Sequence, residues 1–473
     1  MKKILTIAIV FAATIASFSQ SLTYQDLGVL FSQDDKNGSA RFVGMSGAFG
    51  ALGGDVSSMN INPAGIAVFN NSSFSGTFNS RSTDIIASYG DAAFNDRVSL
   101  TNNNEFLNLS HAGAVLVFDS AYKSEWSKFA IGFNYRITKD FSNSFSTEGN
   151  AAITIFDTNP RDTNDPKTLY NFTDGQLFNN TFNGEISELN LAFSAVHLKK
   201  LYVGLGLNFY DLNFFQQAVL TELNSDENRN ILDVELFQEN ITTGTGFSAN
   251  AGFIYKLHPN FRFGASYQTP TWYSEIIQDS NFNQDSDLDI GETTYFPENE
   301  ASFSEFNDFQ LLSYRLKTPS KLTASAAFIF GKNGLLSFDY INRNYQNLTL
   351  SDGVFNNENQ FYQNELKNTN SYNLGTEWRF DRFSIRGGYS FEETPFTNIN
   401  LANNSTLNYQ DIEGYSLGAG YNFGNFKIDF AFTDNDRQNT YNIYSGFNVG
   451  NAEPRANLLI DNRVFTATIT LNL

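Results

Sequence analysis

The three histidines are the first residues to examine for chemistry, because histidine serves both zinc sites and acid–base catalysis. His111, His197 and His258 are scattered, and none has a partner at the spacing that zinc sites use. His197 and His258 fall at expected turns, and His111 falls at the start of an expected strand. A barrel hydrolase would need a Ser/His/Asp arrangement near an external rim, where only His111 is placed. We therefore interpret the histidines as turn and rim residues and expect no enzyme activity and no cofactor.

A short acidic stretch is the candidate metal site. Asp285, Asp287, Asp289 and Glu292 offer oxygen ligands of the kind that Ca²⁺ prefers. The sixth position of an EF-hand-like loop would be Ile290, where such a loop needs glycine. A solvated acidic loop is the favoured interpretation, and we expect no metal.

Three arginines are candidates for binding a ligand carboxylate. Arg136, Arg379 and Arg386 occupy the polar face of their expected strands, where a guanidinium can pair bidentately with a carboxylate. An Arg/Glu ladder along the wall fits the same positions, because Glu377 lies two residues before Arg379 on the same face. The ladder is the favoured alternative.

Aromatic residues in the expected external loops, Phe303 and Phe309 among them, could form a capture groove for an apolar ligand. They fit loop packing, or a docking face for a partner protein, equally well. The set comprises Phe296, Phe303, Phe306, Phe309, Phe355, Phe361 and Tyr362.

The elements that would position these residues are strands, because apolar residues recur with a period of two. In residues 128–140 one face is apolar and the other is small or polar, and the same alternation recurs in seven further stretches. None of these apolar faces carries a charge. A lipid-facing Lys or Arg costs about 2 to 4 kcal/mol at the bilayer midplane, so exposure to lipid explains why these faces carry no charge.

The alternation predicts about fourteen strands, an even number as bacterial outer-membrane barrels require. Tight turns separated by longer loops match the rhythm of periplasmic turns and external loops. The chain is therefore predicted to be all-β, a 14-stranded antiparallel transmembrane β-barrel, although a soluble β-sandwich or jelly roll stays open. The expected strands lie near 71–82, 110–119, 128–140, 184–197, 200–214, 242–257, 261–273, 311–330, 335–349, 367–380, 383–392, 412–423, 426–437 and 461–473.

Composition limits the partners and the location. A net charge of −20 and a pI near 4.5 argue against nucleic acid. The absence of cysteine excludes disulfides, thiol chemistry and a lipoprotein anchor. Residues 1–20 have the charged start, apolar run and small-residue end of a cleaved secretory signal peptide. We therefore expect an exported barrel of residues 71–473 surrounded by outer-membrane lipid.

Residues 21–70 do not alternate and are predicted to lie inside or under the barrel. They contain GSARFVGMSGAFGALGGDVSSMNINPAGIAVF, with Asn62, Pro63, Ala64 and Gly65 just before the first strand. This stretch resembles the N-terminal hatch of the FadL-like long-chain fatty acid transporter family. FRFGASYQTPTWY, RFSIRGGYSFEETPF and EGYSLGAGYNFGNFKIDFAF are similar to the same family. The resemblance covers nearly the whole of the chain after residue 20.

The resemblance implies a fourteen-stranded barrel whose lumen is plugged by the hatch. A ligand would bind near the external loops, pass inward as the hatch shifts, and leave sideways through a gap in the wall. The implied function is passive uptake of a hydrophobic small molecule, fatty acid-like or aromatic, through the outer membrane. The alternative is a non-transporting barrel subunit of a larger outer-membrane assembly, with protein partners. A surface adhesin is a third interpretation.

Overall fold

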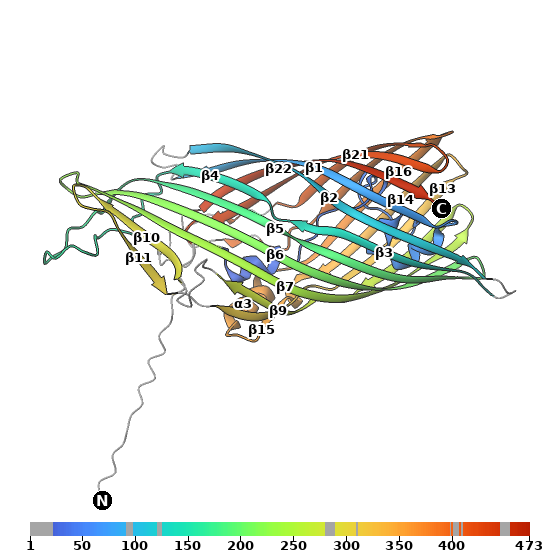
Figure 1. Cartoon of the computed structure of the whole chain (residues 1–473), viewed down its shortest axis with the longest axis horizontal. Coiled ribbons are helices and arrows are strands. Elements are labelled where there is room, and N and C mark those ends of the chain that lie inside the picture. The colour runs from blue at the N-terminus through green and yellow to red at the C-terminus, as the bar shows by residue number, and fades with distance from the viewer. Residues whose placement is uncertain are drawn as a thin grey trace, which may run out of the picture.

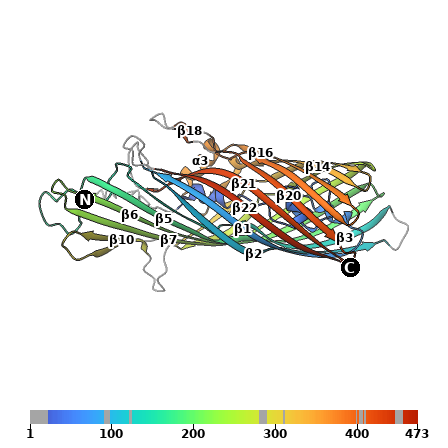
Figure 2. The same cartoon turned by 90° about the horizontal axis from the view of Figure 1, so that it is seen from above.

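The strands close into a single barrel, because β1 (Ser73–Tyr89) pairs with β2 (Val98–Asp119) on one side and with β22 (Arg455–Asn472) on the other. Figures 1 and 2 show the tilted strands surrounding helical segments of the N-terminal region. The fold is a 14-stranded antiparallel β-barrel, as predicted. This computed structural model describes residues 22–90, 98–120, 125–279, 289–308, 311–397, 399–400, 406–407, 410–444 and 455–473.

Most wall strands are continuous, and four are built from two consecutive segments. Besides β1, β2 and β22, the continuous strands are β5 (Phe172–His197), β6 (Leu201–Ser225), β7 (Ile231–His258), β16 (Asn368–Phe380), β17 (Phe383–Glu392), β20 (Ile412–Asn422) and β21 (Phe426–Asn442). The divided strands are β3 (Trp126–Asp140) with β4 (Asn143–Gly149), β8 (Phe261–Gln268) with β9 (Trp272–Asp279), β12 (Leu312–Lys317) with β13 (Lys321–Phe330), and β14 (Gly334–Asn344) with β15 (Thr349–Ser351). The external connections carry β10 (Asp289–Pro297), β11 (Phe303–Asp308), α3 (Asn356–Glu365), β18 (Ile399–Asn400) and β19 (Thr406–Leu407), whereas η4 (Tyr345–Asn347) joins β14 to β15.

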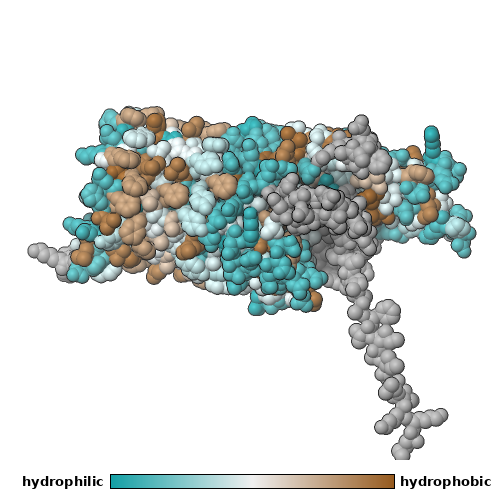
Figure 3. Space-filling view, turned by 180° about the vertical axis from the view of Figure 1, so that it is seen from behind, coloured by the Kyte–Doolittle hydropathy of each residue, from teal (hydrophilic) through white to brown (hydrophobic). Residues whose placement is uncertain are grey.

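The apolar faces point outward, as the alternation predicts. Ile131 and Phe133 are 49% and 48% exposed, whereas Ala130 and Asn134, which flank them, are buried in the lumen. Figure 3 shows the hydrophobic zone around the end of the barrel where the tight turns lie, and a hydrophilic zone beyond it. The zone with the tight turns is therefore the membrane-embedded, periplasmic half. Among the described residues, no helix is long and apolar enough to cross a membrane.

Four strands are much longer than predicted. β2, β5, β6 and β7 contain 22, 26, 25 and 28 residues, whereas about 9 to 11 residues cross a bilayer. The expected external loop between residues 215 and 241 is wrong, because β6 and β7 continue through it to a tight turn at Asp226–Asn230. Above the membrane the outward positions carry charges such as Glu235, so the apolar signal disappears while the strands continue.

Residues 22–72, which we call the lumen segment, lie inside the barrel. They form α1 (Tyr24–Leu30), α2 (Ala40–Val43), η1 (Val56–Asn60) and η2 (Pro63–Val68). A polar side chain caps the start of each helix: Thr23, Ser39, Asp55 and Asn62 accept bonds from backbone N–H groups. Short capped turns allow the segment to fold back repeatedly within the lumen.

Two wall glycines let the segment approach the strands directly. A Cβ at Gly204 of β6 would overlap the backbone of Pro63 and Ala64, and one at Gly252 of β7 would overlap the side chain of Asn62. The segment therefore packs its backbone against the backbone of the wall.

We predict that Gly204→Ala displaces the lumen segment and lowers the free energy of unfolding by about 1 to 3 kcal/mol, because backbone cannot yield to an added methyl group as a side chain can. Gly76→Ala on β1 is the matched control, since a Cβ there meets nothing within 4 Å. Denaturant unfolding of the two variants in detergent, followed by gel mobility, measures the difference. Equal losses in the two would contradict this packing.

Candidate functional site

The Asn-Pro-Ala-Gly motif links the lumen segment to the wall. The Asn62 amide accepts from Ala64 N at 3.1 Å and donates to Gly50 O at 2.8 Å and Phe253 O at 3.0 Å. Pro63 begins η2, where its missing N–H costs no helix bond. Gly65 lies against Gly53, too close for a side chain. The motif thus fixes a compact turn against β7.

Ion pairs tie the segment to other parts of the wall. Arg41 contacts Glu377 of β16 at 2.7 Å, and Asp34 contacts Arg343 of β14 at 2.9 Å. Burial alone would raise the pKa of Asp34, but Lys321 and Arg343 outweigh it and hold that pKa well below its ordinary range. The Arg41–Glu377 pair is largely buried, and removing one partner of a buried pair costs about 3 to 5 kcal/mol, so this contact resists movement.

The backbone hydrogen bonding between β2 and β3 ends partway along these strands. The backbone ladder runs from Asp119 opposite Lys128 to His111 opposite Arg136, and it does not continue beyond that point in the described residues. β2 carries an extra residue, Ser110, at this place, where its register with β1 shifts. A bulge bends a strand and ends pairing, so β2 and β3 separate here.

Asparagine side chains bridge the separated strands. Asn104 donates its Nδ2 to Ser144 O and accepts from Ser144 N, both at 2.9 Å. Asn102 forms the same pair of bonds with Ser146 at 3.3 and 3.1 Å. We call residues 98–110 of β2 and the facing residues 137–146 the seam. Its strands are joined by side chains in place of a backbone ladder.

The lumen segment covers the freed edge of β3 from inside. Asp35 N donates to Thr138 O at 2.6 Å, and Asn37 Nδ2 donates to Ile137 O at 2.9 Å. The Asp35 carboxylate also pairs with Lys139 at 2.8 Å. The segment therefore supplies partners that β2 supplies elsewhere, which couples its position to the state of the seam.

A polar cavity of about 140 Å³ lies between the lumen segment and the wall formed by β17, β20, β21 and β22, and it reaches the seam on one side. Asp35 and Asn37 line it on one side, and Asn108, Asp140 and Asn143 line it at the seam. The described lumen therefore contains solvent-accessible space that reaches the wall at the point where pairing is lost.

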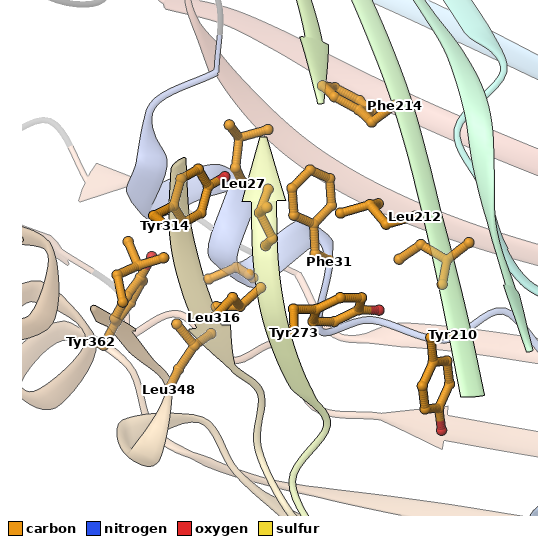
Figure 4. Close-up of a cluster of buried hydrophobic side chains, with 14 of the residues drawn as sticks. Leu27, Phe31, Tyr210, Leu212, Phe214, Tyr273, Tyr314, Leu316, Leu348 and Tyr362 are labelled. Carbon is orange, nitrogen blue, oxygen red and sulfur yellow. The ribbon is translucent and has the colours of Figure 1, made fainter. Parts of the chain in front are cut away.

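Above this cavity the segment is buried in an apolar cluster. Figure 4 shows Leu27 and Phe31 of the segment among side chains from several strands and the external loops. Phe31 packs against Phe141, the residue between β3 and β4, with ring centroids 5.7 Å apart. Tyr362 of α3 donates to Tyr24 O at 2.7 Å from the external side. α1 thus occupies an apolar space that ends at the seam.

The candidate arginines are engaged in ion pairs, as the alternative interpretation expected. Arg136 contacts Glu188, and Arg386 contacts both Glu377 and Asp429. Arg379 contacts Glu377 as well. These guanidinium groups are occupied, so their geometry gives no support to a carboxylate-binding role.

The aromatic candidates do not form one groove in the described part of the chain. Phe303 is buried in β11, stacked on Tyr295 with centroids 5.2 Å apart, whereas Phe355 and Tyr362 pack above α1. Phe309 lies outside the described residues. Loop packing accounts for the aromatic residues that the structure describes.

The remaining candidates are the three histidines and the acidic stretch, and the structure places them in different kinds of position. His197 and His258 end β5 and β7, as expected. His111 is not a rim residue: β2 begins thirteen positions earlier, and His111 is fully buried, 3.3 Å from the Ser57 hydroxyl. Of the acidic stretch, residues 285 and 287 lie outside the described residues, and Asp289 begins β10. No local pattern points to Asp35, because its partner Lys139 lies about a hundred positions away in the sequence. The run Asn102–Asn104, by contrast, is unusual within a strand.

The attachment at Asp34 and Asp35 should weaken in acid. Burial opposes ionisation of Asp35, but Lys139 outweighs it, so both carboxyls have a pKa below the unfolded value of about 3.9. A carboxyl group with a depressed pKa stabilises the folded state above the pKa of the unfolded state. This stabilisation is lost as the pH falls through the pKa of the folded state. A spin label on Gln33→Cys, specific because the chain lacks cysteine, should gain mobility below about pH 4.

In an Asp34→Asn, Asp35→Asn background the same label should already be mobile at neutral pH and respond little to acid. A label whose mobility is unchanged between neutral pH and strong acid in the parent would show that these pairs do not hold the segment.

Comparison with known proteins shows which solved structures share this fold. No protein-family model and no curated protein sequence matches the chain. A FadL homologue from Pseudomonas aeruginosa is 13% identical over 93% of this chain and 99% of its own, with a TM-score of 0.55. The toluene transporter TodX from Pseudomonas putida is 12% identical over 93% and 100%, with a TM-score of 0.51. The toluene transporter TbuX from Ralstonia pickettii is 13% identical over 93% and 99%, with a TM-score of 0.50. Two of these structures are named as transporters and none as an enzyme, and the chain has their fold, that of an outer-membrane β-barrel of the FadL type.

Proposed function

We propose that the chain is an outer-membrane channel for passive uptake of hydrophobic small molecules, either long-chain fatty acid-like or aromatic compounds. The lumen segment acts as its hatch, and the seam between β2 and β3–β4 acts as its lateral exit. The observation that carries this proposal is the loss of the backbone ladder beyond His111 and Arg136, at the place where the lumen segment covers the free edge.

The upper and lower halves of the lumen segment are held by different kinds of contact, which supports a movement of the upper half alone. Leu27 and Phe31 are held by apolar contacts, which an apolar ligand can replace at similar free energy. Arg41 and Asp34 are held by ion pairs, which such a ligand cannot replace. A ligand therefore displaces α1 while the lower part of the segment stays attached and the lumen stays closed.

The contacts of α1 also determine where the lateral exit lies. Phe31 of the segment touches Phe141 at the break between β3 and β4, so displacing α1 removes the packing behind the seam. The seam begins level with Leu107 and Leu109, which are 76% and 47% exposed on the outer face. An apolar solute leaving there enters lipid without crossing the polar lower lumen.

A second candidate function has a specific observation in its favour. β10 pairs with β7, and β11 pairs with β10, so the wall continues above the membrane as a sheet ending at β11. A sheet edge of this kind can pair with another chain, as a subunit of an outer-membrane assembly would. In this alternative the external sheet binds a protein partner and no solute passes.

Crosslinking the seam tests the transport proposal. With Asn104→Cys and Ser144→Cys joined by a short thiol crosslinker, uptake of labelled fatty acid and labelled toluene into cells that depend on the chain should fall at least tenfold. Cleaving the crosslink should restore it. The matched control joins Leu417→Cys to Phe432→Cys, a pair in the fully laddered part of the wall.

Undiminished uptake through the crosslinked seam would remove the lateral exit from the mechanism. No uptake of either solute by the uncrosslinked protein, together with a stoichiometric protein partner recovered from solubilised membranes, would replace the transport function by the subunit function.

A further inference from the structure

An apolar groove lies on the lipid-facing side of the wall. It crosses β3, β5, β6, β7 and β8, which pair in that order, and Figure 1 shows the first four side by side. Its volume is about 790 Å³, within the range of about 300 to 1,000 Å³ that is usual for ligand sites. We call it the outer groove. It shares no lining residue with the polar cavity that reaches the seam.

Small side chains at outward positions create the outer groove. Ala195 of β5, Ala251 of β7 and Ala265 of β8 line it beside larger outward residues. Two of these larger residues, Phe193 and Tyr267, are 50% and 48% exposed. The wall is therefore hollowed toward the lipid at the alanines, and an occupant has to fill this space for the surface to be close-packed.

The chemistry of the lining favours a hydrocarbon chain as the occupant. Ser266 also lines the outer groove, but its hydroxyl donates to Ile61 O of the lumen segment at 2.5 Å. An extended backbone or a polar side chain placed against the alanines would lack hydrogen-bond partners, which is costly away from water. An acyl chain has no polar group to satisfy.

Two consecutive lysines lie at the periplasmic end of the outer groove. Lys199 and Lys200 belong to the tight turn between β5 and β6, three residues before the groove residue Val203. Both lysines are exposed, and neither forms an ion pair with the residues that the structure describes. The neighbouring carboxylate, Glu125, is paired with His197 at 3.1 Å. A chain with a net charge of −20 thus presents positive charge at this end of an apolar groove.

Trp126 indicates the depth of the outer groove in the membrane. It lines the groove and lies opposite His197 in the ladder, with the ring centroids 4.9 Å apart. Tryptophan is enriched at the level of the lipid headgroups. The lysine turn, which follows His197, therefore lies at the headgroups of the periplasmic leaflet, and the alanines lie at the level of the acyl chains.

We propose that the outer groove and the Lys199–Lys200 turn together bind an anionic phospholipid of the periplasmic leaflet. One acyl chain fills the groove, and the phosphate pairs with the two lysines. Confining a flexible chain costs conformational entropy, and the contact between phosphate and lysine offsets that cost. Because two cations are present, the site selects a headgroup with a net negative charge. The site lies outside the barrel, so it does not depend on the proposed transport function.

Tryptophan quenching by phospholipids with brominated acyl chains tests this site, because the chain has three tryptophans and Trp126 lines the groove. The full chain with Trp272→Phe and Trp378→Phe is placed in phosphatidylcholine vesicles that contain a rising proportion of brominated phosphatidylglycerol or brominated phosphatidylcholine. We expect phosphatidylglycerol to bind beside Trp126 about fivefold to tenfold more tightly than phosphatidylcholine, with a smaller preference at high salt.

Removing the two cations should remove the preference. Lys199→Gln with Lys200→Gln should bring the two lipids to within about twofold of each other, since the lysines supply the selection for charge. The matched control is Lys332→Gln with Arg382→Gln, which removes two exposed cations at other tight turns and should leave the preference unchanged.

Filling the groove separates the acyl-chain contact from attraction by the lysines alone. Ala251→Phe with Ala265→Phe should abolish the preference although both lysines remain. Ala419→Phe with Ala467→Phe is the matched control, because both alanines lie beside the exposed Phe430 on another part of the outer face, and it should have no effect.

Equal binding of the two lipids beside Trp126 in the parent would overturn the proposal. So would an equal loss of preference in the Lys332 and Arg382 control, which would mean a diffuse attraction along the whole rim. A dimeric protein in which neither lipid quenches Trp126 would also overturn it, because a second copy of the chain would then occupy the groove.

Discussion

Backbone hydrogen bonding within the membrane is the constraint on which the rest of this structure depends. In hydrocarbon an unpaired N–H or C=O costs several kcal/mol, so each strand edge in the wall needs a partner. Over most of the barrel the neighbouring strand is that partner. Between β2 and β3–β4 the partners are asparagine side chains and the backbone of Asp35. The lumen segment is therefore part of the hydrogen bonding of the wall as well as a plug.

The lumen segment combines two kinds of attachment that respond to different stimuli. Its lower part depends on buried charges and on close packing against wall glycines, which an apolar solute does not affect. Its upper part, α1, depends mainly on apolar contacts, which an apolar solute can supply, together with the hydrogen bond from Tyr362 to Tyr24 O. Under the proposed function, this division lets one segment admit a solute and still block the lumen, and the part proposed to move lies beside the seam.

The sequence predicts the wall well and the lumen poorly, for a physical reason. Lipid excludes charge from outward positions such as Ile131 and Phe133, so the strands within the membrane leave a clear pattern. Above the membrane that selection ends, and the extensions of β2, β5, β6 and β7 leave no such pattern. In the lumen, Arg379 could be placed on the polar face, and its partner Glu377 on the same strand was recognised. Arg41 and Asp35 were not linked to the wall, because pairing across long sequence separations leaves no local signal.

Hydrogen exchange of the protein in lipid nanodiscs tests the central claim most directly, which is that the wall lacks a backbone ladder at the seam. The comparison is between residues 98–110 of β2 and residues 458–469 of β22, a strand paired on both sides. The account predicts that alternate amides of the β2 stretch, those facing β4, exchange much faster than the β22 amides. Equal and uniform protection of both stretches would mean a fully closed wall and would contradict the account.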